Sequence, residues 1–178
     1  MISGHVFIAC SLDGFIARED GDIEWLLQRD DPSEDHGYND FIKDIDGIVM
    51  GRGSFEKILT FGEWPYTRPV VVLSKQLVSS PVPDHLKGLV RFSDLSPKAA
   101  MEMLASEGWK KVYVDGGQII QSFLREGLIA DMVVTQIPVL IGGGRSLFGS
   151  LGKEISLKHI ETKSFPSGLV QLKYQVLK

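Results

Sequence analysis

The chain has 178 residues, of which 43% are hydrophobic and 24% are charged, and its formal net charge at pH 7 is −4. This length and composition predict one globular domain spanning residues 1–178. The acidic balance argues against a sequence-independent nucleic-acid binder, which would need a basic face, whereas a small anionic ligand would need only a local positive site.

The chain begins with an expected strand that is buried on both faces. Residues 6–10 run apolar without alternation, and Asp13-Gly14 predicts the turn that follows. A short apolar return is expected at residues 15–17 and a helical turn at residues 23–27. Cys10 is the only cysteine, so no intrachain disulfide can form, and its apolar neighbours indicate a buried residue and not a reactive thiol.

The charge run at residues 30–36 has two interpretations. Its carboxylates and His36 could form a metal site. Ser33 followed by Glu34 and Asp35 is also typical of a helix N-terminus, and we favour this interpretation and expect no metal. A helix is predicted next because apolar side chains recur at helical spacing: Tyr38, Phe41, Ile42 and Ile45.

An apolar strand end at residues 46–50 runs into a glycine turn. Gly51 and Gly53 allow a sharp turn and the close approach of a ligand, and Ser54 is the expected N-cap of a helix. Arg52 and the free N–H groups of that helix would both favour an anion. The same residues also fit an ordinary strand-to-helix turn with a surface arginine, so both interpretations stay open.

The helix is expected to end near residue 60 and to lead into an aromatic loop at residues 61–66. This loop is a lid or a packed loop, and packing is the more general expectation. A strand follows at residues 69–74, closed by Ser74 and Lys75, which could add a hydroxyl and a cation to an anionic ligand. Another short strand is predicted at residues 89–92.

A second strand-to-helix junction containing glycines is predicted further along. After a helix at residues 96–104, residues 111–114 form a strand that runs directly into Asp115-Gly116-Gly117-Gln118. The next helix ends at Gly127 and has one apolar face, formed by Ile119, Ile120, Phe123 and Leu124.

The last part of the chain is expected to contain antiparallel strands without helices between them. These strands are predicted at residues 132–139, 155–162 and 169–177, with Ser167-Gly168 as the turn of a terminal hairpin. Residues 141–145 are too rich in glycine for regular structure. They form a plain loop or a second loop that approaches an anion, and the two alternatives have equal support.

Together these elements predict a three-layer α/β domain with a mostly parallel sheet of about eight strands and an antiparallel edge. Both glycine junctions would lie at the carboxyl edge of the sheet, where such folds bind ligands. A nucleotide or dinucleotide is therefore expected, although neither junction is a G-x-G-x-x-G motif or a P-loop.

The four histidines are scattered along the sequence, which argues against hydrolysis by a catalytic triad and leaves redox chemistry as the better expectation. None of them is expected beside a serine elbow or a metal ligand. Hydride transfer asks less of the protein, because the chemistry belongs to the cofactor. The histidines are His5, His36, His85 and His159.

Neither the chain start nor any internal segment suggests export or membrane insertion. Residues 1–9 lack the basic region and the long apolar core of a signal peptide, and no run approaches the ~18 apolar residues of a membrane helix. We expect a cytoplasmic protein with no membrane and no nucleic-acid partner.

Four motifs, in this order, resemble the dihydrofolate reductase-like superfamily. Within it they are most similar to the branch of the RibD C-terminal domain, the reductase domain of the bacterial riboflavin-biosynthesis deaminase/reductase. The motifs are Ser11-Leu12-Asp13-Gly14-Phe15-Ile16-Ala17, Met50-Gly51-Arg52-Gly53-Ser54-Phe55-Glu56, Val112-Tyr113-Val114-Asp115-Gly116-Gly117 and Pro138-Val139-Leu140-Ile141-Gly142-Gly143-Gly144. The resemblance implies the three-layer αβα fold of that superfamily and an NADPH cofactor.

By this resemblance, Gly51, Arg52 and Ser54 would hold the adenosine side of NADPH. Arg52 would face the 2′-phosphate, and the start of the following helix would face the pyrophosphate. Ser74 and Lys75 would flank the adenine ribose.

The resemblance also implies contacts with the rest of the cofactor. Gly116 and Gly117, often joined by a cis peptide in the family, would bring the N–H groups of Gly117, Gln118 and Ile119 to the phosphates. The nicotinamide would be walled by Ala9, Ile16 and Ala17.

The resemblance gives three candidates for the catalytic or substrate side: Asp22, Trp25 and Thr135, with Tyr66 nearby. The spacing of Asp22 and Trp25 is that of a carboxylate and tryptophan in dihydrofolate reductases, but a solvated loop aspartate is an equally good interpretation of Asp22. Thr135 corresponds to a threonine of the pterin pocket.

The expected activity is NADPH-dependent reduction of a small heterocyclic substrate, pteridine-like or pyrimidine-like, or of a carbonyl-type substrate. The alternatives are an NADP-binding module without turnover and a true dihydrofolate reductase. The zinc-ligand set of the deaminase is absent from the sequence. The resemblance further implies a homodimer.

Overall fold

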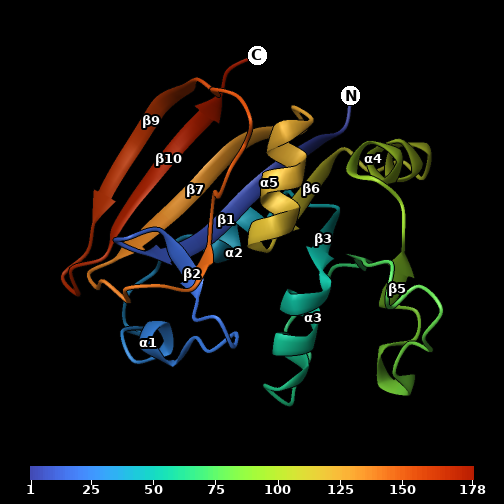
Figure 1. Ribbon diagram of the computed structural model, residues 1–178, viewed down its shortest axis with the longest axis horizontal. Coiled ribbons are helices and arrows are strands. Elements are labelled where there is room, and N and C mark those ends of the chain that lie inside the picture. The colour runs from blue at the N-terminus through green and yellow to red at the C-terminus, as the bar shows by residue number, and fades with distance from the viewer.

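An eight-stranded sheet forms the centre of the protein in the computed structural model, which describes residues 1–178 (Figure 1). Its strand order is β5-β4-β3-β6-β1-β7-β10-β9. Neighbouring strands from β5 to β7 are parallel, and β10 and β9 form an antiparallel edge. The strands are β1 (Ser3–Ser11), β3 (Gly47–Gly51), β4 (Val70–Leu73), β5 (Val90–Ser93), β6 (Lys111–Asp115), β7 (Ile129–Ile137), β9 (Leu157–Ser164) and β10 (Val170–Val176).

Helices cover both faces of this sheet and complete the predicted three-layer α/β fold, which is confirmed. Helices α4 and α5 pack on one face, and α2 and α3 pack on the other. The helices are α1 (Glu24–Leu27), α2 (Tyr38–Lys43), α3 (Arg52–Leu59), α4 (Pro97–Ser106) and α5 (Gly117–Arg125), with a short 3₁₀ turn at Asp84–Leu86. No helix combines the length and the apolar composition that crossing a bilayer requires.

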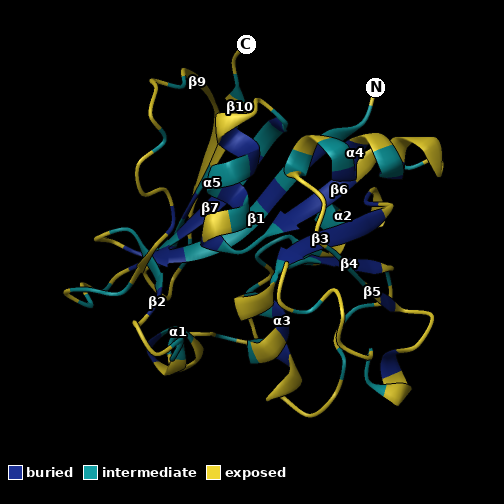
Figure 2. Cartoon of the chain, turned by 45° about the vertical axis from the view of Figure 1, so that its right-hand side comes forward, coloured by how far each residue is buried: buried dark blue, intermediate teal, exposed yellow.

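The central strands are buried because each contributes side chains to two cores. On β3, Val49 packs under α4 and α5, while Ile48 and Met50 pack under α2 and α3, and all three are fully buried. This two-sided burial explains the apolar run without alternation. Figure 2 shows the buried centre of the sheet and the exposed outer surfaces of the helices.

The structure corrects the predicted direction of β7. This strand begins at Ile129 and pairs in parallel with β1, with Ile8 opposite Val134. Helix α5 carries the chain from the end of β6 back to the edge of the sheet at which β6 begins. Strand β7 therefore runs in the same direction as β6 and β1 and belongs to the parallel part. A separate two-stranded ribbon, β2 (Phe15–Ala17) with β8 (Arg145–Ser146), was not predicted.

Both predicted serine N-caps are wrong. Helix α3 begins at Arg52 because Gly51, in an extended conformation, is already its N-cap, and Ser54 lies inside the first turn. Helix α2 begins after Gly37, whose φ of 83° makes the turn, while the backbone N–H and hydroxyl of Ser33 bond to Asp31. No cluster of three or more acidic, histidine or cysteine side chains is arranged to hold a metal ion.

Candidate active site

A cleft of about 530 Å³ opens at the carboxyl edge of the sheet, beside the ends of β1, β3 and β6. The lining includes backbone turns and side chains from distant parts of the chain, as expected for the ligand site of an open α/β sheet. Five of the predicted cofactor-binding residues line it: Ala9, Ile16, Ala17, Ser54 and Gly116.

The two predicted glycine turns lie against each other at this cleft. A β-carbon at Gly116 would lie 2.8 Å from the hydroxyl oxygen of Ser54, and one at Gly51 would lie 3.0 Å from the side chain of Ile119. Gly116 has a φ of 100°, which side chains disfavour. The Gly116–Gly117 peptide is trans, contrary to the cis bond that the resemblance implied, and this φ makes the turn.

Asp115 places a carboxyl group at the junction of β6 and α5, facing the cleft. Burial raises the pKa of Asp115 from 3.8 to about 6, and hydrogen bonds from the N–H of Gly116 and the hydroxyls of Tyr113 and Ser54 partly oppose this rise. Tyr113 Oη lies 3.4 Å from Asp115 Oδ1 and donates to the carbonyl oxygen of Phe7 at 3.0 Å. The carboxyl therefore exchanges its proton near neutral pH, which suits a general acid.

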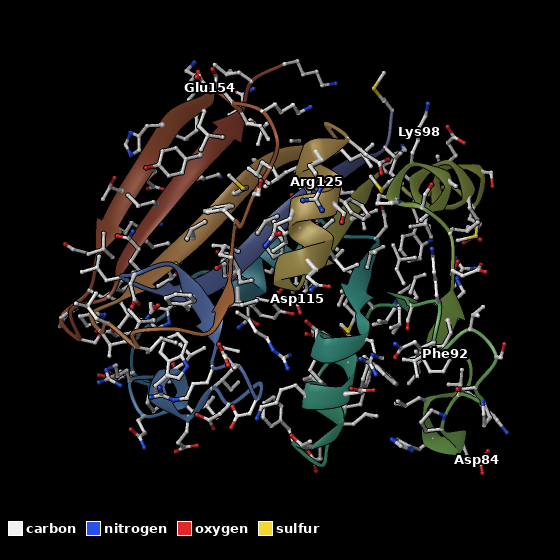
Figure 3. All side chains as sticks on the ribbon, viewed as in Figure 1. Asp84, Phe92, Lys98, Asp115, Arg125 and Glu154 are labelled. Atoms are coloured by element: carbon white, nitrogen blue, oxygen red, sulfur yellow. The ribbon has the colours of Figure 1, made fainter.

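Two tyrosines, the buried Tyr113 and the half-buried Tyr66, share this part of the cleft. Tyr66 and Tyr113 both line it, and burial raises the pKa of each phenol. Both phenols therefore stay protonated near neutral pH. Figure 3 shows Asp115 between α5 and α3. Asp115 was predicted only as part of a glycine motif, although a carboxylate directly after a buried strand is a signal for a site residue.

Two cations, Arg145 and Lys57, also line the cleft. Arg145 lies on β8 and its Nε donates to the carbonyl oxygen of Glu19 at 3.2 Å. The ammonium group of Lys57 lies 5.9 Å from the ring centre of Phe61. Neither residue was identified as a site residue from the sequence. For Arg145 the reason is that β8 reaches the cleft only through its pairing with β2.

The remaining predicted cofactor residues do not line the cleft. Arg52 is exposed on α3 and pairs with Glu56 at 3.7 Å. The hydroxyl of Ser74 accepts from the backbone N–H groups of Gln76 and Leu77 at 3.2 Å. The other residues outside the lining are Gly51, Lys75, Gly117, Gln118 and Ile119.

The structure does not bring the three substrate-side candidates together in the cleft. Asp22 pairs with Arg18 at 3.6 Å on the surface loop. Trp25 is 4% exposed and belongs to a core cluster with Ile137 and Leu169.

Thr135, on β7, is 5% exposed, and its hydroxyl accepts from the amide of Gln171 at 3.0 Å. Its neighbour Gln171 also donates to the carbonyl oxygen of His36. The hydroxyl of Thr135 is therefore bonded within the protein, and among the residues considered for the substrate side only Tyr66 lines the cleft.

The glycine-rich loop before β8 binds a carboxylate of the same chain. Asp13 accepts from the N–H groups of Ile141 and Gly142 at 3.2 and 2.8 Å. These bonds, together with the bond from Ser11, lower the pKa of Asp13. These two N–H groups are therefore already bonded to a carboxylate of the chain. They are not free to bind an anionic ligand, so the backbone at Ile141 and Gly142 is not the anion-binding loop that was one of the two alternatives.

A histidine does lie beside a serine, at the other edge of the sheet. His5 is 2.9 Å from Ser3 Oγ through Nε2 and 2.9 Å from Asp131 Oδ2 through Nδ1. Strand β1 aligns Ser3 with His5 and β7 supplies Asp131, but Ser3 begins a strand and is not on a serine elbow, so the expectation that no histidine lies beside such an elbow stands. The backbone N–H groups of Ser3 and Gly4 are bonded to carbonyl oxygens, so they form no oxyanion hole.

Comparison with known proteins shows the family to which the chain belongs. The family model of the RibD C-terminal domain matches residues 4–171. The protein YwjB of Bacillus subtilis (strain 168), named as uncharacterized, is 34% identical over 172 residues, which cover 95% of each chain.

Solved structures give the same result. A crystal structure named as a candidate riboflavin biosynthesis protein from Shewanella sp. PV-4 has a TM-score of 0.92 and 36% identity, covering 99% of this chain and 100% of that one. The deaminase/5-amino-6-(5-phosphoribosylamino)uracil reductase of Thermotoga maritima has a TM-score of 0.73 and 16% identity, covering 99% of this chain and 57% of that one. The latter similarity concerns the fold alone.

Proposed function

Because the chain belongs to the RibD C-terminal domain family, we propose that it is an NADPH-dependent reductase that acts on a small pteridine-like or pyrimidine-like heterocycle. The observation that carries this proposal is the half-buried carboxyl of Asp115, whose pKa is raised and which lies where two glycine turns meet at the cleft. A proton source beside a nucleotide-sized cleft is what reduction by hydride requires of a protein.

The residues of the cleft fit a dinucleotide. Gly53 and Gly116 have no side chain, and the groups nearest to their β-carbon positions are the guanidinium of Arg145 and the hydroxyl of Ser54, both of which can donate to a phosphate. The first N–H groups of α5 have no acceptor within that helix and favour an anion. Ala9 and Ala17 leave room for a flat ring. Arg52, on the exposed side of α3, would reach the 2′-phosphate that distinguishes NADPH from NADH.

The protein would control the proton, while NADPH supplies the hydride when bound. The pKa of Asp115 is about 6, so a fraction of the carboxyl groups is protonated near neutral pH. The protonated carboxyl would deliver its proton to a substrate nitrogen placed against the cleft floor. The phenols of Tyr66 and Tyr113 border the same region. General acid catalysis of this kind contributes roughly 10²–10⁴-fold in rate. We therefore assign the substrate contacts to Asp115 and Tyr66, and not to Trp25.

Calorimetry with NADPH and NADH tests the cofactor assignment. Arg52→Ala should weaken NADPH binding by roughly 1.5–3 kcal/mol, since it removes a charge-assisted phosphate contact, and should leave NADH binding nearly unchanged. Arg18→Ala is the matched control, because Arg18 is also half-exposed in an i,i+4 pair, with Asp22, and does not line the cleft. Absence of micromolar NADPH binding, or an unchanged cofactor preference in Arg52→Ala, would contradict the assignment.

The turnover assay is separate from the binding assay. We expect oxidation of NADPH with at least one compound in a panel of dihydropteridines, pyrimidinones and quinones, and a fall of about 10²-fold or more in kcat for Asp115→Asn. Binding of NADPH without oxidation by any compound of the panel would instead favour a module without turnover. Tight methotrexate binding would favour a true dihydrofolate reductase.

A further inference from the structure

Arg145 brings a guanidinium group with two free ends to the mouth of the cleft. Its Nε donates to the carbonyl oxygen of Glu19 at 3.2 Å, which holds the side chain in place. The terminal nitrogens Nη1 and Nη2 take part in none of the hydrogen bonds or ion pairs of the chain. A guanidinium with both terminal nitrogens free presents the fork that matches two oxygens of one phosphate.

Arg145 lies beside the first turn of α3, and the residue that follows it lies beside the start of α5. A β-carbon at Gly53, in the first turn of α3, would lie 3.3 Å from Nη1, and one at Gly21 would lie 3.5 Å from either terminal nitrogen. The next residue, Ser146, has its carbonyl oxygen 2.7 Å from where a β-carbon of Gly117 would lie, at the start of α5. Strand β8 therefore contacts both turns, through the guanidinium of Arg145 at Gly53 and through the carbonyl oxygen of Ser146 at Gly117.

Several features hold β8 in this position. At Gly144, with a φ of 145°, a β-carbon would overlap the carbonyl oxygen of Ala17, so only glycine lets β8 approach β2 this closely. The carboxylate of Asp13 holds the preceding loop through the N–H groups of Ile141 and Gly142. These contacts hold the stretch of backbone that carries Arg145.

The carboxylates that line the cleft do not neutralise Arg145. Glu56 pairs with Arg52 at 3.7 Å, and Asp20 accepts from the backbone N–H of Asp22 at 2.9 Å. Asp115 lies at the junction of β6 and α5 and pairs with no cation. The cleft therefore has two cations without a carboxylate partner, Arg145 and Lys57.

From this geometry we propose that the side chain of Arg145 binds a phosphate group in the cleft and that Lys57 adds a second positive charge. The ligand group is a phosphate ester, which is either the pyrophosphate of NADPH or a phosphate carried by the substrate. The proposal rests on the proposed function in naming these two sources, and goes beyond it in identifying the residue and in predicting that a phosphate group contributes to recognition.

The test compares the wild-type protein with Arg145→Met, Arg145→Lys and Arg125→Met by calorimetry. The control Arg125 is an exposed arginine that also bonds to a backbone carbonyl, of Ser150, at 3.0 Å. Figure 3 shows Arg125 at the end of α5 away from Asp115. The probes are NADPH, for the cofactor, and uridine monophosphate against uridine, for a phosphate on a pyrimidine substrate.

We expect Arg145→Met to weaken NADPH or uridine monophosphate at least tenfold, with partial recovery in Arg145→Lys and no change in Arg125→Met. Loss on NADPH alone assigns the phosphate to the cofactor, and loss on uridine monophosphate assigns it to the substrate. Equal binding by Arg145→Met and wild type, equal loss in Arg125→Met, or no binding of either phosphate probe by wild type overturns the proposal. Arg145-dependent binding of uridine monophosphate without any binding of NADPH would keep this proposal and refute the NADPH assignment.

Discussion

Asp115→Asn tests the central electrostatic feature of the cleft through the stability of the protein. The pKa of this carboxyl is 3.8 in an ordinary environment and about 6 in the folded protein, because burial disfavours the charge. The difference is about two pH units, and each unit corresponds to about 1.4 kcal/mol, so the full effect is about 3 kcal/mol.

The sign follows from which state holds the proton more tightly. The folded protein does, so protonation of Asp115 stabilises it, and this contribution is complete below pH 3.8 and is lost as the pH rises through about 6. Above pH 7 the ionised carboxylate lowers the free energy of unfolding by about 3 kcal/mol relative to acidic conditions. Asparagine has nearly the same shape and cannot ionise, so it removes the penalty.

Thermal unfolding followed by circular dichroism at pH 4 and pH 8 measures this effect. At pH 8, Asp115→Asn should melt roughly 6–12 °C above wild type, since 1 kcal/mol shifts the Tm of a protein of this size by about 2–4 °C. At pH 4 the two proteins should melt at nearly the same temperature. A variant that is less stable than wild type at pH 8, or a shift that is equal at both pH values, would refute the reasoning.

Asp46→Asn provides a control of opposite sign. Asp46 accepts from the backbone N–H groups of Lys111 and Lys110 at 2.9 and 2.6 Å, and these bonds hold its pKa below 3.8. Its contribution to stability is therefore present above pH 3.8 and is lost as the pH falls through the lowered value. Asp46→Asn should be less stable than wild type at pH 8, with the difference shrinking in acid.

Two further predictions concern β8 and the buried thiol. Gly144→Ala should lower the free energy of unfolding, measured by urea titration, by roughly 1–3 kcal/mol and should weaken ligand binding. The φ of 145° at Gly144 and the nearby carbonyl of Ala17 exclude a side chain there. Gly143→Ala should be nearly neutral in the same titration, because a β-carbon at Gly143 meets open space. Cys10 is 4% exposed and burial raises its pKa to about 11, so an aromatic disulfide reagent at pH 8 should label it only after unfolding, and rapid labelling of the native protein would contradict this.

Local patterns were sufficient for the elements whose stability comes from burying their own side chains. The apolar run that ends at Met50 became a central strand because both of its faces are covered. The glycines at positions 51, 116 and 117 lie at strand-to-helix turns as expected, because conformational freedom is a property of the residue itself.

Elements that depend on distant partners were predicted less well. Ser33 and Glu34 have the composition of a helix start, but Glu34 accepts from the N–H and hydroxyl of Ser167, on the terminal hairpin, at 2.8 and 2.6 Å. Likewise β7 was assigned to the antiparallel part, because strand direction is decided by the crossover helix and not by the residues of the strand.

The same distinction between local patterns and distant partners applies to the candidate active site. The sequence by itself determined that two glycine turns would meet at the carboxyl edge of a parallel sheet, since the order of strands and helices dictates where those turns lie. Only the tertiary structure decided that Asp115 is half-buried there with a raised pKa and that β8 brings Arg145 beside the first turn of α3. Burial and charge pairing depend on atoms far apart in the chain, and these quantities determine the chemistry of the cleft.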